Sequence, residues 1–446
     1  MEYNTVFFGD VAKIKNGYAF KSKEFKEEGI PVIKIKNISS PIVDIKDTQK
    51  VSIKTYEETK NFLLKKDDIL ISLTGSGVNQ MSSAVGKVGK IEFDYTALQN
   101  QRVGKFELKY TNSADLDFLF YYFLQPKITN YLVRNSTGSA NQANISSKLI
   151  ESVKIPNFSL KKQKSISKFL NQITRKIEIN KKIIANLEEL SQTLFKRWFV
   201  DFEFPDENGN PYKSSGGEMI DSELGEIPLN WKCSKIKDIN VIISDHVANG
   251  SFKSLKENVQ FTEDLNDKYA VFARNVDLKK GDNRFEKYVT KSSYEFLRKS
   301  HLHGHEVIIS NVGDVGSVYL SPILNRPMVL GNNQIFINSD EKSLNYYFYL
   351  FFKSSIGKNL IDSITSGSVQ MKFNKTDLRN SLIVFPCKND MNNLITVIKK
   401  YIYSIENKKS ENMQLIQLRD TLLPKLMSGE IEIPDDIEVN EDELSI

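Results

Sequence analysis

Two stretches of the chain carry apolar residues in alternating steps of four and three, the a/d pattern of a coiled-coil helix. The predicted seam positions are Ile166, Leu170, Ile173, Ile177, Ile184, Leu187, Leu194 and Trp198 in the first helix, and Leu394, Ile398, Tyr401, Ile405, Leu415, Leu422 and Leu426 in the second. Polar residues interrupt both seams at matched depth, Asn180 with Lys408 and Ser191 with Arg419. Since polar seam residues fix register, this match predicts that the two helices pair with each other. The alternative is that each helix packs only on its own domain.

A region of short β-rich runs bounded by Gly, Asn and Ser precedes each helix, for example Pro31–Ile38 and Val271–Val276. Pro, Gly, Ser and Asn between the halves indicate an exposed linker. Pro424 is expected to kink or stop the second helix. We therefore predict a first domain over residues 1–158, a helix over 159–200, a linker over 201–230, a second domain over 231–387, a helix over 388–427 and an acidic tail over 428–446.

The two halves of the chain also resemble each other in sequence. Leu187–Phe199 aligns with Leu415–Met427, Asp68–Ser72 with Glu306–Ser310, and Asn100-Gln101 with Asn333-Gln334. These matches keep their order along the chain, which is typical of an internal repeat. A helix of roughly 40 residues would be about 60 Å long. Two diverged units on such a rod could read two unlike DNA segments at a fixed separation, so the site would not be a palindrome.

Composition and charge narrow the class of protein. Among 446 residues, 40% are hydrophobic and 26% charged, which excludes wholesale disorder. Two cysteines are too few for a disulfide scaffold, and no apolar run approaches the ~18 residues of a membrane span. We expect a cytoplasmic protein without a membrane anchor. The net charge of +5 includes an acidic tail from Ser428 to Ile446, so the body is more basic and a polyanion partner is plausible.

Specific motifs then suggest a family. They are Gly17–Ser22 (GYAFKS), Leu194–Phe202 (LFKRWFVDF), Leu224–Trp231 (LGEIPLNW) and Leu418–Glu430 (LRDTLLPKLMSGE). With them the chain resembles, over essentially its whole length, the specificity subunit of type I restriction-modification systems. The first half lacks a clear counterpart of Leu224–Trp231.

The resemblance implies an α+β fold with two pseudo-repeated α/β target recognition domains, separated by two long helices that form an antiparallel coiled coil. It implies a non-catalytic subunit that reads a bipartite asymmetric site on double-stranded DNA and binds two modification (methyltransferase) subunits and, for cleavage, restriction subunits. S-adenosylmethionine, ATP and Mg²⁺ are then expected on those partners, with no cofactor on this chain. The alternatives are a specificity subunit of a different bipartite-site restriction system or a standalone DNA-binding regulator. A bridge between proteins that never touches DNA is disfavoured by the basic body.

Motifs for catalysis do not emerge from the sequence. No Gly-x4-Gly-Lys-Ser/Thr and no Asn-Pro-Pro-aromatic segment occurs, so a self-sufficient nuclease or methyltransferase is not expected. His301, His303 and His305 alternate and could share one face of a strand as metal ligands. Their counterparts in the first half are Leu, Lys and Asp, so we favour a solvated or phosphate-facing turn and predict no metal.

Candidate DNA contacts come from polar loops that recur in both halves. Small residues let backbone N–H groups approach phosphate, and Asn and Gln can pair with adenine. The alternative is an ordinary polar turn. The predicted DNA-binding residues are Lys34, Lys36, Thr74, Ser76, Asn79, Gln80, Gln101, Arg102, Thr137, Ser139, Asn141 and Gln142 in the first half, and Arg274, Asn275, Asn311, Asn333, Gln334, Ser368, Gln370 and Lys372 in the second.

Overall fold

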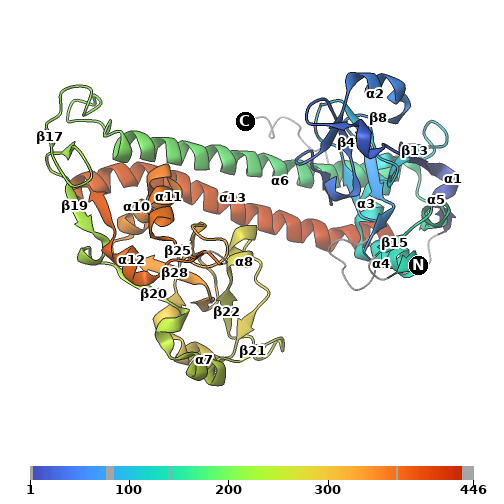
Figure 1. The fold of residues 1–446 in the computed structure, drawn as a ribbon. Coiled ribbons are helices and arrows are strands. Elements are labelled where there is room, and N and C mark those ends of the chain that lie inside the picture. Colours follow the sequence, from blue (N-terminus) through green and yellow to red (C-terminus); the bar gives the residue numbers. More distant parts are fainter. Residues whose placement is uncertain (1–3, 77–84, 140–141, 368–369, 434–446) are drawn as a thin grey trace. The chain divides into compact units, whose positions relative to one another are not determined.

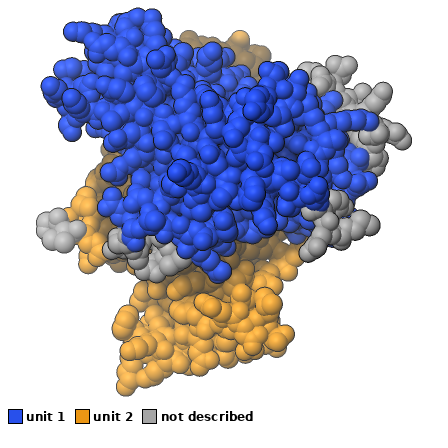
Figure 2. Space-filling model, turned by 90° about the vertical axis from the view of Figure 1, so that its right-hand side faces the viewer, with its two compact units in different colours: residues 1–176, 415–446 blue, residues 177–414 orange. Residues whose placement is uncertain are grey.

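The structure, a computed structural model, describes residues 4–76, 85–139, 142–367 and 370–433. It divides into two compact units, which are coloured in Figure 2. Unit 1 comprises Met1–Lys176 with Leu415–Ile446, and unit 2 comprises Ile177–Gln414. The long helices α6 (Leu160–Phe195) and α13 (Lys388–Ser428) contribute residues to both units (Figure 1).

Unit 1 contains two larger sheets and two smaller ones. The six-stranded sheet has the order β2 (Ala12–Asn16), β13 (Val103–Leu108), β9 (Ile69–Ser72), β11 (Val88–Lys90), β6 (Ile42–Val43), β5 (Ile38–Ser39). The five-stranded sheet has the order β3 (Phe25–Lys26), β7 (Gln49–Val51), β4 (Ile30–Ile33), β12 (Ala97–Gln99), β8 (Leu63–Leu64). The smaller sheets are β1 (Thr5–Phe7) with β16 (Lys154–Pro156), and β10 (Thr74–Gly75) with β15 (Gln142–Asn144) and β14 (Thr137–Ser139). The short helices are α1 (Phe8–Val11), α2 (Ile53–Glu58), α3 (Leu116–Leu124), α4 (Pro126–Arg134) and α5 (Ser147–Glu151), with 3₁₀ turns at Ser22–Glu24, Ile35–Asn37 and Lys60–Phe62.

Unit 2 repeats this plan. Its four-stranded sheet has the order β20 (Ile242–Asp245), β28 (Gln334–Asn338), β25 (Val307–Ser310), β26 (Val318–Leu320). Its five-stranded sheet has the order β21 (Phe261–Thr262), β23 (Tyr288–Val289), β22 (Ala270–Ala273), β27 (Met328–Leu330), β24 (His301–Leu302). The pairs β17 (Met219–Ile220) with β18 (Ile227–Pro228), and β19 (Lys232–Lys235) with β29 (Leu382–Phe385), complete the strands. The short helices are α7 (Phe252–Asn258), α8 (Asn275–Lys280), α9 (Lys291–Phe296), α10 (Lys342–Lys353), α11 (Ser355–Ile364) and α12 (Lys375–Asn380), with 3₁₀ turns at Ile236–Asp238, His246–Asn249 and Arg298–Ser300.

The strand orders of the two units share two patterns, although the larger sheet of unit 1 has β6 and β5 in addition. Each five-stranded sheet contains a parallel pair at its centre, β4 with β12 in unit 1 and β22 with β27 in unit 2, among otherwise antiparallel neighbours. The order β2-β13-β9-β11 likewise corresponds to β20-β28-β25-β26. Since a parallel pair needs a crossover connection, the recurrence of both patterns shows that the repeat seen in the sequence is a repeat of topology.

An aromatic helix forms the centre of each core. In unit 1, Phe118 of α3 shares one buried cluster with Ile71 of β9, Leu170 of α6 and Leu423 of α13. In unit 2, Phe348 of α10 shares a cluster with residues of the corresponding elements β25, α6 and α13. Both helices are apolar almost all around, so they are buried between a sheet and the long helices.

The two long helices pair antiparallel within each unit. In unit 1, Ile166 and Leu170 share a buried core with Leu423 and Leu426, so the start of α6 lies beside the end of α13. In unit 2, the Asn180 Nδ2 donates to Asn412 Oδ1 at 3.0 Å, and both side chains are buried. The predicted pairing is confirmed, and the polar layer joins two asparagines across the seam, which fixes the register.

Two features near the helix ends differ from expectation. Of the kink or stop expected at Pro424, the stop does not occur: α13 continues to Ser428, because a proline so near the end of a helix removes only one late backbone hydrogen bond. The segment after α6 is not simply an exposed linker. It begins with a π-helical turn at Lys196–Val200, and Phe202, Phe204 and Ile227 are buried in the core of unit 2.

Candidate nucleic-acid interface

Three of the predicted polar segments of unit 1 meet where β9 ends. The backbone N–H of Leu73 donates to the Arg102 carbonyl at 2.9 Å, and Ile145 N–H donates to the Leu73 carbonyl at 2.9 Å. Thr74 then pairs with Asn144 across β10 and β15. The strand end, the segment containing Arg102 and the hairpin of β14 and β15 therefore form one surface.

Unit 2 assembles the equivalent three segments. Asn311, which follows β25, donates its backbone N–H to the Asn333 carbonyl at 3.1 Å and accepts from Phe373 N–H at 3.2 Å. Lys372 pairs with both Val312 and Ser366 through isolated bridges. The structure thus brings Asn311, Asn333 and Lys372 together, as it brings their counterparts together in unit 1. Their contact with DNA stays a prediction.

A glycine shapes the hairpin in each unit. Gly138 has φ +106 and Gly367 has φ +114, in the region that side chains rarely adopt. A Cβ would lie 2.3 Å from the Gln142 carbonyl oxygen in the first case and 2.4 Å from the Gln370 carbonyl oxygen in the second. A side chain at either position would clash with this backbone, so both positions require glycine.

The strand register corrects one alignment made from the sequence. Val103 lies opposite Ser72, and Gln334 lies opposite Ser310, so Gln334 corresponds to Val103 and Asn333 to Arg102. The counterpart of Gln101 is then Asn332, an exposed residue that sequence reasoning missed. Gln334 itself is buried and donates from Nε2 to the Ala273 carbonyl at 2.8 Å, so the structure gives it a supporting place under the loop.

Arg274 and Lys34 occupy the same position after β22 and β4 but differ in their partners. The Arg274 guanidinium donates twice to buried Asp277, at 2.7 Å each, and to Glu286 at 2.9 Å. The hydrogen bond to Asp277 is the main cause that raises the pKa of Arg274. The Lys34 ammonium contacts Gln49 and lies 4.0 Å from the centroid of the Phe25 ring, and no carboxylate among the described residues pairs with it. Lys34 is therefore better placed than Arg274 to bind phosphate.

Several buried acceptors lie at these loops without a partner. The Thr74 hydroxyl in unit 1, and the amide oxygens of Asn275 and Asn311 in unit 2, have no hydrogen-bond donor within the described part of the chain. Native structures rarely leave such atoms unpaired, and those that do concentrate them at functional sites. Lys279, which sequence reasoning missed, lies beside the same loop through its 2.9 Å ion pair with Asp314.

The remaining predicted contacts divide into exposed residues and residues that cannot be placed. Lys36, Gln101, Arg102, Thr137, Gln142, Gln370 and Lys372 are exposed, whereas Ser76 and Asn275 are half-buried. Asn79, Gln80, Asn141 and Ser368 lie outside the described residues, as does the side chain of Ser139.

Comparison of the sequence with known protein families identifies the family of this chain. The family described as the type I restriction modification DNA specificity domain matches residues 1–189 and 228–416. The chain belongs to this family. A relative named as a putative type I restriction enzyme specificity subunit from Methanocaldococcus jannaschii is 24% identical over 94% of this chain and 91% of its own. A specificity subunit from Haemophilus influenzae is 23% identical over 71% of this chain and 77% of its own.

A solved structure shows the same fold. The crystal structure of the S subunit of a type I restriction-modification system from M. genitalium superposes with a TM-score of 0.55 at 15% identity, covering 96% of both chains. The predicted fold class is confirmed, and the chain is a DNA specificity subunit, which is a non-catalytic role. Among the described residues, no helix is both long enough and apolar enough to span a membrane.

The three histidines of this specificity subunit differ in their surroundings. His303 is exposed, as expected for a solvated turn. His301 instead stacks on Tyr294 with ring centroids 3.8 Å apart, and its Nε2 lies 2.8 Å from the Tyr294 carbonyl. His305 is buried, with Nδ1 2.5 Å from the Tyr346 hydroxyl. In the part of the chain that is described, no three His, Cys, Asp or Glu side chains are grouped for a metal ion.

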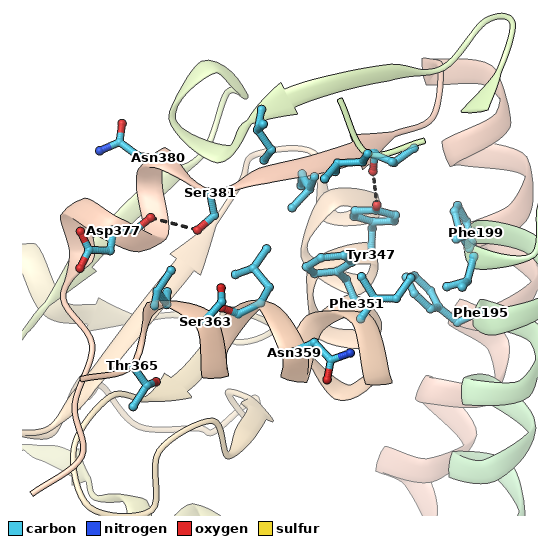
Figure 3. A pocket seen from close by; sticks show the side chains of 18 of the residues that line it. Phe195, Phe199, Tyr347, Phe351, Asn359, Ser363, Thr365, Asp377, Asn380 and Ser381 are labelled. Carbon is cyan, nitrogen blue, oxygen red and sulfur yellow. Dashed lines mark hydrogen bonds between the residues drawn. The ribbon is translucent and has the colours of Figure 1, made fainter. Parts of the chain in front are cut away.

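A pocket of about 890 Å³ opens elsewhere in unit 2 (Figure 3). Phe195 at the end of α6, Phe199 in the π-helical turn that follows it, and Tyr347 and Phe351 from α10 form its aromatic wall. Its lining includes one carboxylate, Asp377, and no Lys, Arg or His. Since phosphate binding needs cations or aligned N–H groups, the pocket suits an apolar group better than nucleic acid.

The α11 side of this pocket differs between the units. Counted from the start of each helix, Ile356 and Leu360 of α11 correspond to Lys127 and Tyr131 of α4. The aromatic residues of α10 do recur, since Phe351 corresponds to Tyr122 when the helices are counted from their ends. The aliphatic residues of α11 are thus a departure from the repeat.

Proposed function

We propose that this specificity subunit reads a bipartite, asymmetric DNA sequence. Residues 1–158 and residues 231–387 would each read one segment, using the loop clusters described above. Catalytic chemistry would come from two methyltransferase subunits and, for cleavage, restriction subunits, which would bind S-adenosylmethionine, ATP and Mg²⁺. The single observation that carries the proposal is the recurrence of one loop cluster, with unlike side chains, in two units of the same topology.

Equivalent positions of the two clusters present different chemistry. Arg102 in unit 1 corresponds to Asn333 in unit 2. An arginine fork fits the O6 and N7 of guanine, whereas an asparagine amide fits adenine. Two surfaces that differ in this way would select different bases, so the DNA site would be asymmetric.

The helix pair supports the second part of the proposal. In unit 2, Leu190 on α6 and Val397 and Met413 on α13 keep 36–40% of their surface exposed. Exposed apolar residues along a two-helix pair favour the docking of further helices. We assign this surface to the methyltransferase subunits.

Sequencing of methylated DNA tests the proposal, in a host that expresses the chain with its methyltransferase and restriction subunits. Replacement of residues 1–158 by the first domain of a relative should change one segment of the methylated motif and leave the other segment and the spacing unchanged. Arg102→Ala and Asn333→Gly form a matched pair, because glycine tolerates the positive φ of Asn333. Each should relax one base of one segment only, with a discrimination loss of about 1–3 kcal/mol.

Two outcomes would contradict the proposal. One is a chimera that alters both segments together, because a single surface would then read the entire site. The other is methylation that ignores sequence in the unmodified complex.

A further inference from the structure

The outer face of α6 carries a row of cations that the candidate DNA loops do not include. Lys164, Lys168 and Arg175, all in unit 1, are exposed. At about 100° per residue they fall within about 40° of one another around the helix, opposite the seam that packs on α13. The last two lie about 10.5 Å apart along the helix axis. We call these three residues the α6 ridge.

The ridge differs from the other cations of α6 in lacking acidic partners. Lys162 pairs with Glu432 at 2.6 Å, Lys181 with Glu178 at 2.7 Å and Lys196 with Asp201 at 2.6 Å. For the three ridge residues, no ion pair occurs with any carboxylate in residues 4–76, 85–139, 142–367 or 370–433. Their charge is therefore available to a partner outside the described part of the chain.

The repeat supplies an internal comparison. The alignment of Leu187–Phe199 with Leu415–Met427 places Asn392, Thr396 and Tyr403 of α13 at the three ridge positions. All three are uncharged, and Thr396 and Tyr403 are exposed like Lys168 and Arg175. Lys399, seven residues after Asn392, is a cation on this face of α13, and it lies over the rings of Tyr346 and Tyr403. Solubility alone would not place three cations at positions of one helix that are uncharged in the other. The difference indicates a partner that approaches α6 in particular.

The composition of the ridge favours a polyanion over a protein. Lysine is depleted in protein–protein interfaces, which need an apolar centre. Lysine and arginine at regular intervals, with polar residues between them, suit the phosphates of a duplex, where each neutralised phosphate releases counterions.

We infer that the α6 ridge contacts the phosphate backbone of duplex DNA independently of sequence. The inference rests on the proposed function, since it assumes that the recognition domains hold the DNA. The ridge would add affinity and salt dependence while the loops supply the choice of bases.

The test compares two double variants of the full-length chain, assembled with its methyltransferase subunits. Lys168→Gln/Arg175→Gln removes two ridge charges, and Lys181→Gln/Lys196→Gln removes two charges of the same helix that have acidic partners. Binding of a duplex with the methylated motif and of a scrambled duplex is measured by fluorescence anisotropy between 50 and 200 mM salt. The ridge variant should lower the slope of log K against log salt by about 1.8, at about 0.9 per phosphate contact. It should weaken both duplexes by the same factor.

Three results would overturn the inference. Equal slope changes in the two variants would mean that only net charge matters. Unchanged DNA binding with loss of methyltransferase subunits from the complex would assign the ridge to a protein interface. A ridge variant that alters the methylated motif would place these residues in base reading. Failure of the proposed function is distinguishable, because the unmodified complex would then bind both duplexes equally while the slope on the scrambled duplex still reports on the ridge.

Discussion

The two units connect to their long helices through different chemistry at equivalent positions. In unit 1, the Lys90 ammonium lies 2.8 Å from Asp117 and 3.2 Å from Asp67. The Asn171 amide of α6 donates to Asp117 at 2.6 Å, and the Tyr121 hydroxyl donates to Asn171 at 2.9 Å. An ion pair and its hydrogen bonds therefore attach α3 to α6.

The charge of this junction is stable near neutral pH. Burial alone would lower the pKa of Lys90, but its hydrogen bond with Asp117 and the charges of Asp117 and Asp67 outweigh burial and raise that pKa. Burial raises the pKa of Tyr121 to about 12. Neither group changes its charge between about pH 5 and pH 8.

Unit 2 places titratable groups at the same junction. His305 and Asp67 share a left-handed backbone, with φ 67 and φ 68, and Tyr346 corresponds to Asp117 when α10 and α3 are counted from their ends. His305 Nδ1 lies 2.5 Å from the Tyr346 hydroxyl, and its Nε2 lies 3.6 Å from a Glu406 oxygen on α13.

Burial governs the protonation of this second junction. It lowers the pKa of His305, with help from the charges of Lys342 and Lys399, and it raises the pKa of Glu406 to about 7 against the opposing charge of Lys409. The comparison teaches that the repeated fold requires partners for the buried polar atoms of the junction, and that either fixed or titratable charges can supply them.

We expect the largest effect from a substitution that breaks the junction of unit 1. Asp117→Ala leaves the half-buried Lys90 with Asp67 alone and removes the acceptor of Asn171. We expect a loss of about 3 kcal/mol in the free energy of unfolding of unit 1, because a removed partner leaves a buried charge poorly compensated. Native-state hydrogen exchange of the α3 amides measures it.

The matched change in unit 2 is Tyr346→Phe. It removes one hydrogen bond to His305 and strands no charge, so about 1 kcal/mol is expected from exchange of the α10 amides. Equal losses in the two variants would mean that the ion pair of unit 1 has no special role in its junction.

A smaller effect separates Arg274 from Lys34. Arg274→Gln strands the buried Asp277 carboxylate and should cost unit 2 about 2 kcal/mol in calorimetric unfolding, with little change in DNA affinity. In unit 1, the residue equivalent to Asp277 is the neutral Asn37. Lys34→Gln therefore strands no carboxylate and should cost unit 1 less than about 1 kcal/mol. If Lys34 binds phosphate, this variant lowers the salt slope by about 0.9. The reverse assignment of the two effects would contradict the comparison.

The sequence contains enough information for the repeat and the helix pair, because both depend on periodic apolar positions. Heptad spacing from Ile166 and from Leu394 predicts two long helices, and ordered matches predict two similar units. The Asn180–Asn412 layer was only partly predictable. Asn180 is one of the predicted polar interruptions of the first seam, but its partner Asn412 depends on the antiparallel register of the two helices.

Contacts between distant strands could not be predicted in the same way. Gln334 looks like a base-reading amide in a polar loop, yet its place under the loop depends on a hydrogen bond to Ala273 on another strand. The role of His305 depends in the same way on Tyr346, which lies 41 residues away in the chain. Side-chain partners of this kind follow from tertiary packing, which local pattern does not encode.

The smallest effect concerns pH and sharpens the contrast between the junctions. Glu406 has a folded pKa of about 7 and an unfolded pKa near 4.5, so the folded state holds the proton more tightly. Its contribution to stability is therefore present below about pH 4.5 and is lost as pH rises toward 7. Glu406→Gln removes this loss. Between about pH 4.5 and pH 7, the free energy of unfolding of the variant should therefore rise by about 1 kcal/mol relative to that of the unmodified chain, after a discount for partial exposure.

His305→Asn supplies the opposite slope. The folded pKa of His305 lies below its unfolded value of about 6.5, so its contribution is present above that pH and is lost as pH falls. The stability of His305→Asn relative to the unmodified chain should therefore increase as pH falls below 6.5. The relative stability of Glu406→Gln should instead increase as pH rises. Urea unfolding followed by α10 and α13 amide exchange at pH 5, 6 and 7 measures both slopes. Flat differences for both variants would show that this junction, like that of unit 1, keeps its charges through the neutral range, and the contrast between the two units would then be one of geometry alone.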